Sequence, residues 1–208
     1  MPSEMYSNDS EAPGASSYYQ VAPKPQQMYG VVLSLPDDFA EEIAARREKL
    51  NPRAPHRIFP HITLRAPFTA DDPKSLPTVL EDVALRYLPV QVAARGLGAF
   101  VGSTNNVIYT KVERSPRLVR LHEAIVEALP NVRNVYSHAT AHQFENWIPH
   151  ITIVDGISEE RLREMQNDLA EYVPEAEWEA REIVLVRSES DDLGSLRWTS
   201  TRAFRIPA

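Results

Sequence analysis

One six-residue pattern occurs twice in this chain and constrains its fold more than any other feature. It consists of an apolar residue, proline, histidine, isoleucine, threonine and a second apolar residue, at residues 59–64 and again at residues 148–153. The two histidines, His61 and His150, lie 89 residues apart. Two matched segments in a chain of 208 residues indicate that one structural unit is used twice.

Each copy is expected to be a β-strand, because apolar and β-branched residues follow a proline. Side chains alternate between the two faces of a strand, so His61 shares a face with Thr63 and His150 shares a face with Thr152. If the two units pack about a pseudo-twofold axis, these polar faces meet across a central cleft. A lone histidine is commonly structural, but two matched pairs favour a binding site.

Two imidazoles and two hydroxyls are the groups that cleavage of a phosphodiester requires. With an ordinary pKa near 6.5, one imidazole can be neutral while the other carries a proton, so one can act as general base and the other as general acid. Thr63 and Thr152 can donate hydrogen bonds to the non-bridging phosphate oxygens. The sequence leaves open which of His61 and His150 is the base.

The elements expected around the two copies alternate between strands and helices, which predicts an α+β fold. Strands are expected at residues 29–35, 59–68, 90–101, 107–113, 148–157, 178–189 and 196–206, and helices at about 38–50, 71–87, 115–129 and 158–173. The two repeats would then form lobes of about residues 29–101 and 106–206. Within the second lobe, the segment that leads into the second copy of the pattern, about residues 130–149, has no expected helix or strand and is a candidate lid.

Composition excludes several classes of function. The formal net charge of −7 and the pI near 5.4 argue against a protein that coats long nucleic acid, which needs many lysines and arginines. The chain has no cysteine, so it has no disulfide, thiolate metal site or cysteine nucleophile. The P-loop, dinucleotide-binding and serine-hydrolase motifs are absent from the sequence.

The two ends of the chain differ in character. Residues 1–27, rich in Ser, Pro, Tyr, Gln and Ala, are expected to be a disordered tail without a signal peptide, and residues 28–208 a single domain. No segment approaches the roughly 18 continuous apolar residues of a membrane span. We therefore expect a cytoplasmic monomer that does not contact a membrane.

Further residues are candidates for contact with a ligand. Arg65 and Lys111 could bind phosphate, and Tyr109 and Trp147 could stack on a base. Solvation is the more common role for the basic residues and core packing for the aromatic ones. The same reasoning applies to Phe68, Arg197 and Arg202.

A metal site is a weaker alternative. His138 and His142 are four residues apart, as on one face of a helix, but no third ligand lies near them in the sequence. We therefore expect neither a metal ion nor another cofactor.

The segments His61-Ile62-Thr63-Leu64 and His150-Ile151-Thr152-Ile153 resemble the paired His-x-Thr-x motifs of the 2H phosphoesterase superfamily, which includes the LigT-like 2′-5′ RNA ligases and RNA 2′,3′-cyclic phosphodiesterases. The resemblance covers about residues 28–206. It implies a bilobal α+β fold of two pseudo-symmetric β-α-β units with antiparallel sheets around a central cleft. It also implies catalytic roles for the two histidines and phosphate binding for the two threonines.

The resemblance implies a range of substrates. It favours a metal-independent cyclic nucleotide phosphodiesterase that hydrolyses the 2′,3′-cyclic phosphate at RNA 3′ ends to a 2′-phosphate, with 2′-5′ RNA ligase activity as a related reaction. ADP-ribose 1″,2″-cyclic phosphate and cyclic or 2′-5′-linked oligonucleotides are alternative substrates. A non-catalytic nucleotide sensor is a further alternative, although a binder needs no matched proton donor and acceptor.

Overall fold

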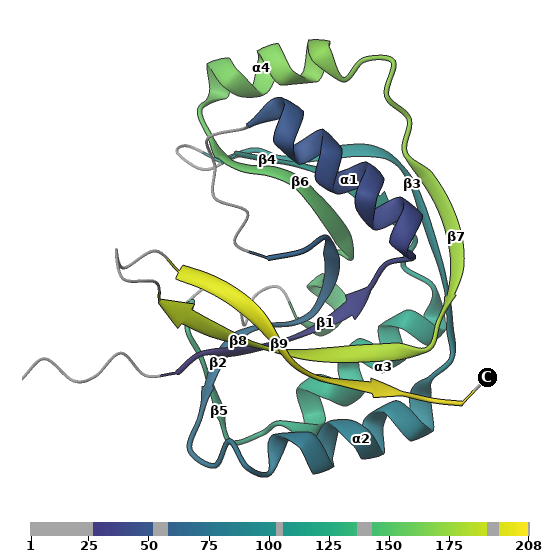
Figure 1. Cartoon of the computed structure of the whole chain (residues 1–208), viewed down its shortest axis with the longest axis vertical. Helices are drawn as coiled ribbons and strands as arrows, with labels where there is room; N and C mark the ends of the chain where they lie inside the picture. Colours follow the sequence, from purple (N-terminus) through teal and green to yellow (C-terminus); the bar gives the residue numbers. More distant parts are fainter. Residues whose placement is uncertain (1–26, 52–57, 103–105, 137–142, 191–195, 208) are drawn as a thin grey trace, which may run out of the picture.

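Two antiparallel sheets carry helices on their outer sides (Figure 1). The computed structural model describes residues 27–51, 58–102, 106–136, 143–190 and 196–207. The strands are β1 (Tyr29–Ser34), β2 (His61–Ala70), β3 (Val90–Phe100), β4 (Asn106–Val112), β5 (Val132–Asn134), β6 (His150–Ile157), β7 (Glu175–Ala180), β8 (Glu182–Ser190) and β9 (Leu196–Arg205). The helices are α1 (Asp37–Leu50), α2 (Leu76–Tyr87), α3 (Pro116–Ala128) and α4 (Glu159–Asp168), and a 3-10 turn, η2, spans Phe144–Asn146.

Each sheet contains strands from both sequence repeats. The order is β5-β2-β1-β8-β9 in the first sheet and β6-β4-β3-β7 in the second. In each sheet the strand with the His-Thr motif pairs with the strand that begins its own repeat, and the next strand comes from the other repeat. The expected α+β fold with two lobes is confirmed. The expected division into residues 29–101 and 106–206 is wrong, because β3 joins the second sheet and β8 joins the first.

The crossing from β7 to β8 is abrupt. A single strand was expected at residues 178–189, but β7 ends at Ala180 in the second sheet and β8 begins at Glu182 in the first. Only Arg181 separates them, and neither glycine nor proline marks the break. The preceding helix, α4, ends at Asp168 and not near residue 173.

Two other expected features are partly described. The segment at 130–149 is not wholly irregular, since it contains β5, which pairs with β2, and the η2 turn. Residues 137–142 lie outside the described residues, so the proposed lid is untested there. Of the expected tail, residues 1–26 also lie outside them, whereas the Gln27 amide donates to the Ser188 carbonyl on β8.

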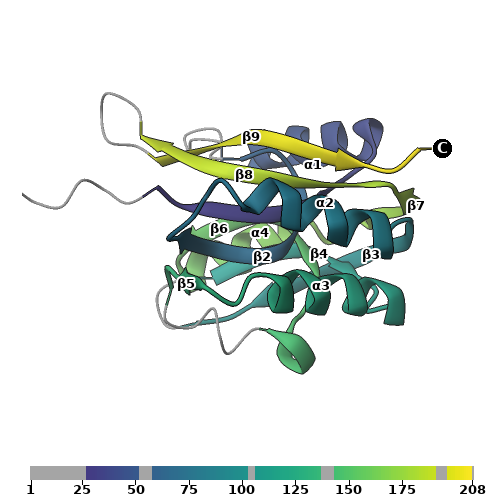
Figure 2. The same ribbon diagram turned by 90° about the horizontal axis from the view of Figure 1, so that it is seen from below.

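The helices are exchanged between the repeats in the same way as the strands. α1, from the first repeat, packs against β6, and α3, from the second repeat, packs against β2. α2 packs beside α3 and against β8 and β9, and α4 packs against β4 (Figures 1 and 2). One continuous apolar core includes Ile62 and Leu64 of β2 and Ile151 and Ile153 of β6. Because these apolar faces are buried, the His-Thr faces turn to the cleft.

The helix starts follow from local sequence. Ser115 accepts a hydrogen bond from the Leu118 N–H, with Pro116 in the first turn of α3. Ser158 caps α4 by accepting from the Arg161 N–H. The second cap starts α4 directly after the motif strand β6.

Arg47, in the last turn of α1, links the two motif segments. Its Nε and Nη2 donate to the Thr152 carbonyl at 3.0 and 2.7 Å, and its Nη1 donates to the Ile58 carbonyl at 2.9 Å. Burial lowers the pKa of Arg47 to about 10, and the nearby Asp155 carboxylate partly opposes this shift. The side chain stays charged at neutral pH and holds β6 against the segment that enters β2.

We predict that Arg47→Met lowers the free energy of unfolding in urea by about 1–3 kcal/mol, because it removes charge-assisted hydrogen bonds to two carbonyls. Lys49→Met is the matched control, since Lys49 is exposed in the same turn and should change stability little. Equal stability of the two variants would show that Arg47 does not hold the two segments together.

Candidate active site

The two motif histidines have the same local geometry. His61 Nδ1 lies 2.7 Å from the Phe59 carbonyl, and His150 Nδ1 lies 2.8 Å from the Ile148 carbonyl. A carbonyl can only accept a hydrogen bond, so each Nδ1 carries a proton. In both rings Nε2 is therefore the nitrogen that can exchange a proton with a ligand.

His61 is held in its neutral form. Burial lowers its pKa to about 4, outweighing the hydrogen bond to Phe59, and the positive charges of Arg47 and His150 lower it further. The effect of His150 shows that the two imidazoles lie near enough to interact. Thr63 Oγ1 is 3.2 Å from His61 Nε2. Because neutral Nε2 accepts hydrogen bonds, the Thr63 hydroxyl is the donor in this contact.

A β-bulge follows the threonine of each motif. On β2 the extra residue is Leu64, and on β6 it is Ile153, because the strand register shifts by one residue at each point. Bulges bend a strand and change the direction of its side chains, and they are common beside active sites. The expected alternation of burial holds from each histidine to the residue after the threonine, Leu64 or Ile153, and fails at the next residue.

Aromatic rings hold His150 in place. Its ring centroid lies 5.0 Å from that of Phe100, edge to face, and 5.3 Å from that of Tyr109. Phe100 and Tyr109 stack on each other at 4.3 Å. Tyr109 lies directly over Gly98, where an added Cβ would be 2.6 Å from Tyr109 Cζ. Because residue 98 has no side chain, the Tyr109 ring that contacts His150 can occupy this position.

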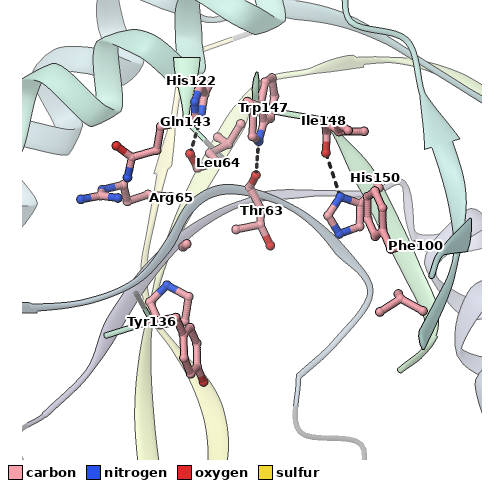
Figure 3. A pocket seen from close by; sticks show the side chains of 13 residues that line it. Thr63, Leu64, Arg65, Phe100, His122, Tyr136, Gln143, Trp147, Ile148 and His150 are labelled. Carbon is pink, nitrogen blue, oxygen red and sulfur yellow. Dashed lines mark hydrogen bonds between the residues drawn. The ribbon is translucent and has the colours of Figure 1, made fainter. Parts of the chain in front are cut away.

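Trp147 and His122 connect the second motif to the first. Trp147 Nε1–H donates to the Thr63 carbonyl at 3.1 Å, and the His122 ring stacks on Trp147 at 4.2 Å (Figure 3). His122 Nδ1–H donates to the Leu64 carbonyl at 2.7 Å, and its Nε2 accepts from the Phe144 N–H at 3.1 Å. Burial lowers the pKa of His122 to about 4, so this histidine is neutral and both its nitrogens are engaged.

A cavity of about 490 Å³ adjoins His150 and Thr63 (Figure 3), a volume within the range of small-molecule sites. Its other lining residues are Leu64, Arg65, Ala66, Pro67, Phe100, Val107, His122, Tyr136, Gln143, Trp147 and Ile148. A smaller cavity of about 100 Å³ adjoins His61 and shares Thr63, Arg65 and Pro67 with the larger one. Gly30, Val32, Ile58, Val186 and Trp198 complete its walls. Thr63 thus lies where the two cavities meet.

The other candidate contacts differ in their placement. Arg65 and Trp147 line the larger cavity, and Tyr109 supports His150. Tyr109 and Lys111 stand opposite Thr152 and His150 on the neighbouring strand, and Lys111 is exposed.

Three candidates are not brought to the site. Phe68 is fully buried in the core. Arg202 pairs with Glu81 of α2, on the helix side of the first sheet, and exposed Arg197 lines neither cavity described above.

Several site residues have little signal in the sequence. Arg47, Phe100 and Gln143 belong to no motif. His122 had a usable signal, because it falls on the apolar stripe of α3 with Leu118 and Ile125, where a histidine must find hydrogen-bond partners.

Two findings concern metal binding and membrane-spanning helices. Within the described residues, no group of three or more His, Cys, Asp or Glu side chains could hold a metal ion. His138 and His142 lie outside those residues. In the same part of the chain, none of the helices has the length and apolar character needed to cross a membrane.

Two bacterial proteins are similar to this chain in sequence. A Staphylococcus aureus (strain JH1) protein named "Putative phosphoesterase" is 29% identical over 180 residues, which cover 85% of this chain and 98% of the relative. A Bacillus cereus (strain B4264) protein of the same name is 33% identical over 102 residues, 48% of this chain and 54% of the relative.

Solved structures share the fold. A Thermus thermophilus protein superposes with a TM-score of 0.57 at 22% identity, covering 86% of this chain and 97% of its own. Escherichia coli LigT complexed with phosphate superposes with a TM-score of 0.56 at 19% identity, covering 88% of this chain and 98% of its own. LigT complexed with 3′-AMP superposes with a TM-score of 0.54 at 19% identity, covering 88% of this chain and 100% of its own.

The family model described as the 2′-5′ RNA ligase superfamily matches residues 35–192, which include both motifs and most of both sheets. The chain therefore belongs to the 2′-5′ RNA ligase superfamily, the LigT-like 2H phosphoesterases.

Proposed function

We propose that this protein is a metal-independent phosphodiesterase that hydrolyses the 2′,3′-cyclic phosphate at RNA 3′ ends to a 2′-phosphate. The observation that supports this most directly is the pair of matched imidazoles, each with Nδ1 fixed on a carbonyl, beside two cavities that share Thr63. The superfamily assignment supports phosphoester chemistry in general. The likeness to LigT, crystallised with phosphate and with 3′-AMP, fits a nucleotide substrate.

His61 is assigned as the general base, because its lowered pKa keeps Nε2 unprotonated at neutral pH. Nε2 takes a proton from water as the water oxygen attacks phosphorus. The bond from phosphorus to O3′ breaks, and His150 Nε2–H gives its proton to O3′. The product carries a 2′-phosphate and a free 3′-hydroxyl.

The two threonines are assigned to the non-bridging phosphate oxygens. Thr63 donates to His61 Nε2 in this structure. Rotation of its hydroxyl towards a phosphate oxygen would leave that nitrogen to the attacking water and place a donor where charge develops. Thr152 occupies the corresponding position of the second motif.

The first test is hydrolysis of an RNA oligonucleotide that ends in a 2′,3′-cyclic phosphate, in buffer containing EDTA. We expect 2′-phosphate ends, and a kcat at least about 10²-fold lower in His61→Ala and in His150→Ala, because each variant loses one proton transfer.

Thr152→Ser should keep most activity and Thr152→Val should lose it. Thermal melting checks that each variant is folded.

Binding without turnover would replace this proposal with the nucleotide sensor. Loss of activity in EDTA, restored by one divalent ion, would contradict metal independence. Faster cleavage of ADP-ribose 1″,2″-cyclic phosphate or of a 2′-5′-linked dinucleotide would change the substrate but keep the mechanism.

The pH dependence of kcat/KM tests the assignment of the base. A lowered pKa means that His61 stays neutral in more acidic solution than an ordinary histidine, so the acidic limb should lie near pH 4 and not near 6.5. His61→Ala should abolish that limb and leave the basic one. Survival of the acidic limb in His61→Ala, with the fold checked by circular dichroism at each pH, would assign the base to another group.

Because the Tyr109 ring contacts both Gly98 and His150, substitutions at Gly98 and Tyr109 should have coupled effects on kcat. Gly98→Ala should lower kcat by about 10-fold or more, since the new methyl group displaces the ring that holds the proposed acid, and misplaced catalytic groups are costly. In a Tyr109→Ala background the same substitution should cost little more. Additive effects in this double-mutant cycle would show that Gly98 acts by another route.

A further inference from the structure

Arg65 is a buried cation with two nitrogens that make no hydrogen bond to the described residues. The residue is only 5% exposed, and the two nitrogens are Nε and Nη1. A buried charged donor without an acceptor is costly, so such groups are rare in folded proteins and require an explanation. The Arg65 side chain lines the larger cavity, where a ligand can reach it.

Gln143 presents a second donor at the same place. It is 9% exposed, lines the same cavity, and its Nε2 also lacks a partner within the described part of the chain. The ends of the Arg65 and Gln143 side chains point toward one another in Figure 3. A guanidinium has only donors, so this end of the cavity offers several N–H groups that require an acceptor.

This group of donors is separate from the two His-Thr pairs. The Arg65 guanidinium carbon lies 5.7 Å from the ring centroid of Phe68, which is further along β2 than Arg65 itself. The guanidinium thus lies near the Phe68 ring, although Arg65 also lines the small cavity beside His61. Figure 3 shows Thr63 between His150 on one side and Arg65 on the other. A ligand with its reacting phosphate at Thr63 can therefore place a second group at Arg65.

We propose that Arg65 and Gln143 form a second anion subsite, which binds a phosphate of the substrate other than the one that is cleaved. This inference rests on the proposed function and makes it more specific. The preferred substrate class is a 2′,3′-cyclic nucleotide that carries a further phosphate on its 5′ side, as the last nucleotide of an RNA chain does. A nucleoside 2′,3′-cyclic phosphate without that group leaves the subsite unfilled.

Phosphate fits these donors better than a neutral acceptor does. The planar guanidinium can give two parallel hydrogen bonds to two oxygens of one phosphate, and charge-assisted bonds are about twice as strong as neutral ones. The Gln143 amide can donate to the same phosphate. The cavity also has apolar walls, such as Leu64 and Trp147 near Thr63, which can contact the nucleoside.

The test compares two substrates that differ by one phosphate, adenosine 2′,3′-cyclic phosphate and its 5′-phosphorylated form. We expect wild-type kcat/KM to be about 10- to 100-fold higher for the 5′-phosphorylated substrate, the range that charge-assisted hydrogen bonds provide. Arg65→Met should reduce this ratio to near one, and Arg65→Lys should restore part of it. Arg202→Met removes the same charge from the outer face and should keep the wild-type ratio.

Stability separates a binding role from a structural one. Arg65→Met removes an unpaired buried charge, so the free energy of unfolding should stay equal or rise. A loss of stability together with an unchanged substrate ratio would overturn the proposal and give Arg65 a packing role.

A binding measurement distinguishes failure of the subsite from failure of the proposed function. By calorimetry, the wild type should bind adenosine 2′,5′-bisphosphate at least about 10-fold more tightly than adenosine 2′-monophosphate, and Arg65→Met should abolish the difference. If this holds without hydrolysis of either cyclic substrate, the subsite stands and the phosphodiesterase assignment fails. If both are hydrolysed with a ratio near one, the subsite fails and that assignment stands.

Discussion

The site depends on hydrogen bonds that each repeat donates to the motif strand of the other. Arg47, from the first repeat, donates to the Thr152 carbonyl, and Trp147, from the second, donates to the Thr63 carbonyl. These carbonyls lie at the bulges, where strand pairing is interrupted and the backbone needs other partners. His122 does the same for Leu64. Neither repeat can therefore hold its own His-Thr pair in place without the other.

The two motifs have nearly the same sequence but different surroundings, and the difference allows different chemistry. His61 is half-buried, and desolvation together with the nearby Arg47 charge favours its neutral form. His150 packs against the stacked rings of Phe100 and Tyr109 and lines the larger cavity. Two identical side chains can take opposite parts in proton transfer when their environments separate their pKa values. The pseudo-symmetry thus supplies two imidazoles, and its imperfection makes them unequal.

Local patterns in the sequence predicted what depends on local structure. Alternation along the motif strands gave the faces of His61 and His150 correctly, and serine caps marked the starts of α3 and α4. The exchange of β3 and β8 between sheets could not be predicted, because strand pairing depends on partners distant in the chain. The break at Arg181 also has no local signal, since both β7 and β8 contain residues that suit one continuous strand. Arg47 was missed because its partners are carbonyls in two other segments.

Two arginines beside the motifs, the half-buried Arg47 and the buried Arg65, show how the same type of side chain can serve two purposes. Arg47 gives all three of its nitrogens to backbone carbonyls, and its position is fixed by the fold. Arg65 has Nε and Nη1 buried beside a cavity without an acceptor in the described residues. The cost of burying Arg47 is offset within the protein, whereas that of Arg65 is offset only when a ligand supplies oxygens. Arg65 thus lowers the stability of the free protein and raises that of its complex with an anionic ligand. It contributes to specificity, because a ligand without a matching anion does not offset the cost of burying the charge.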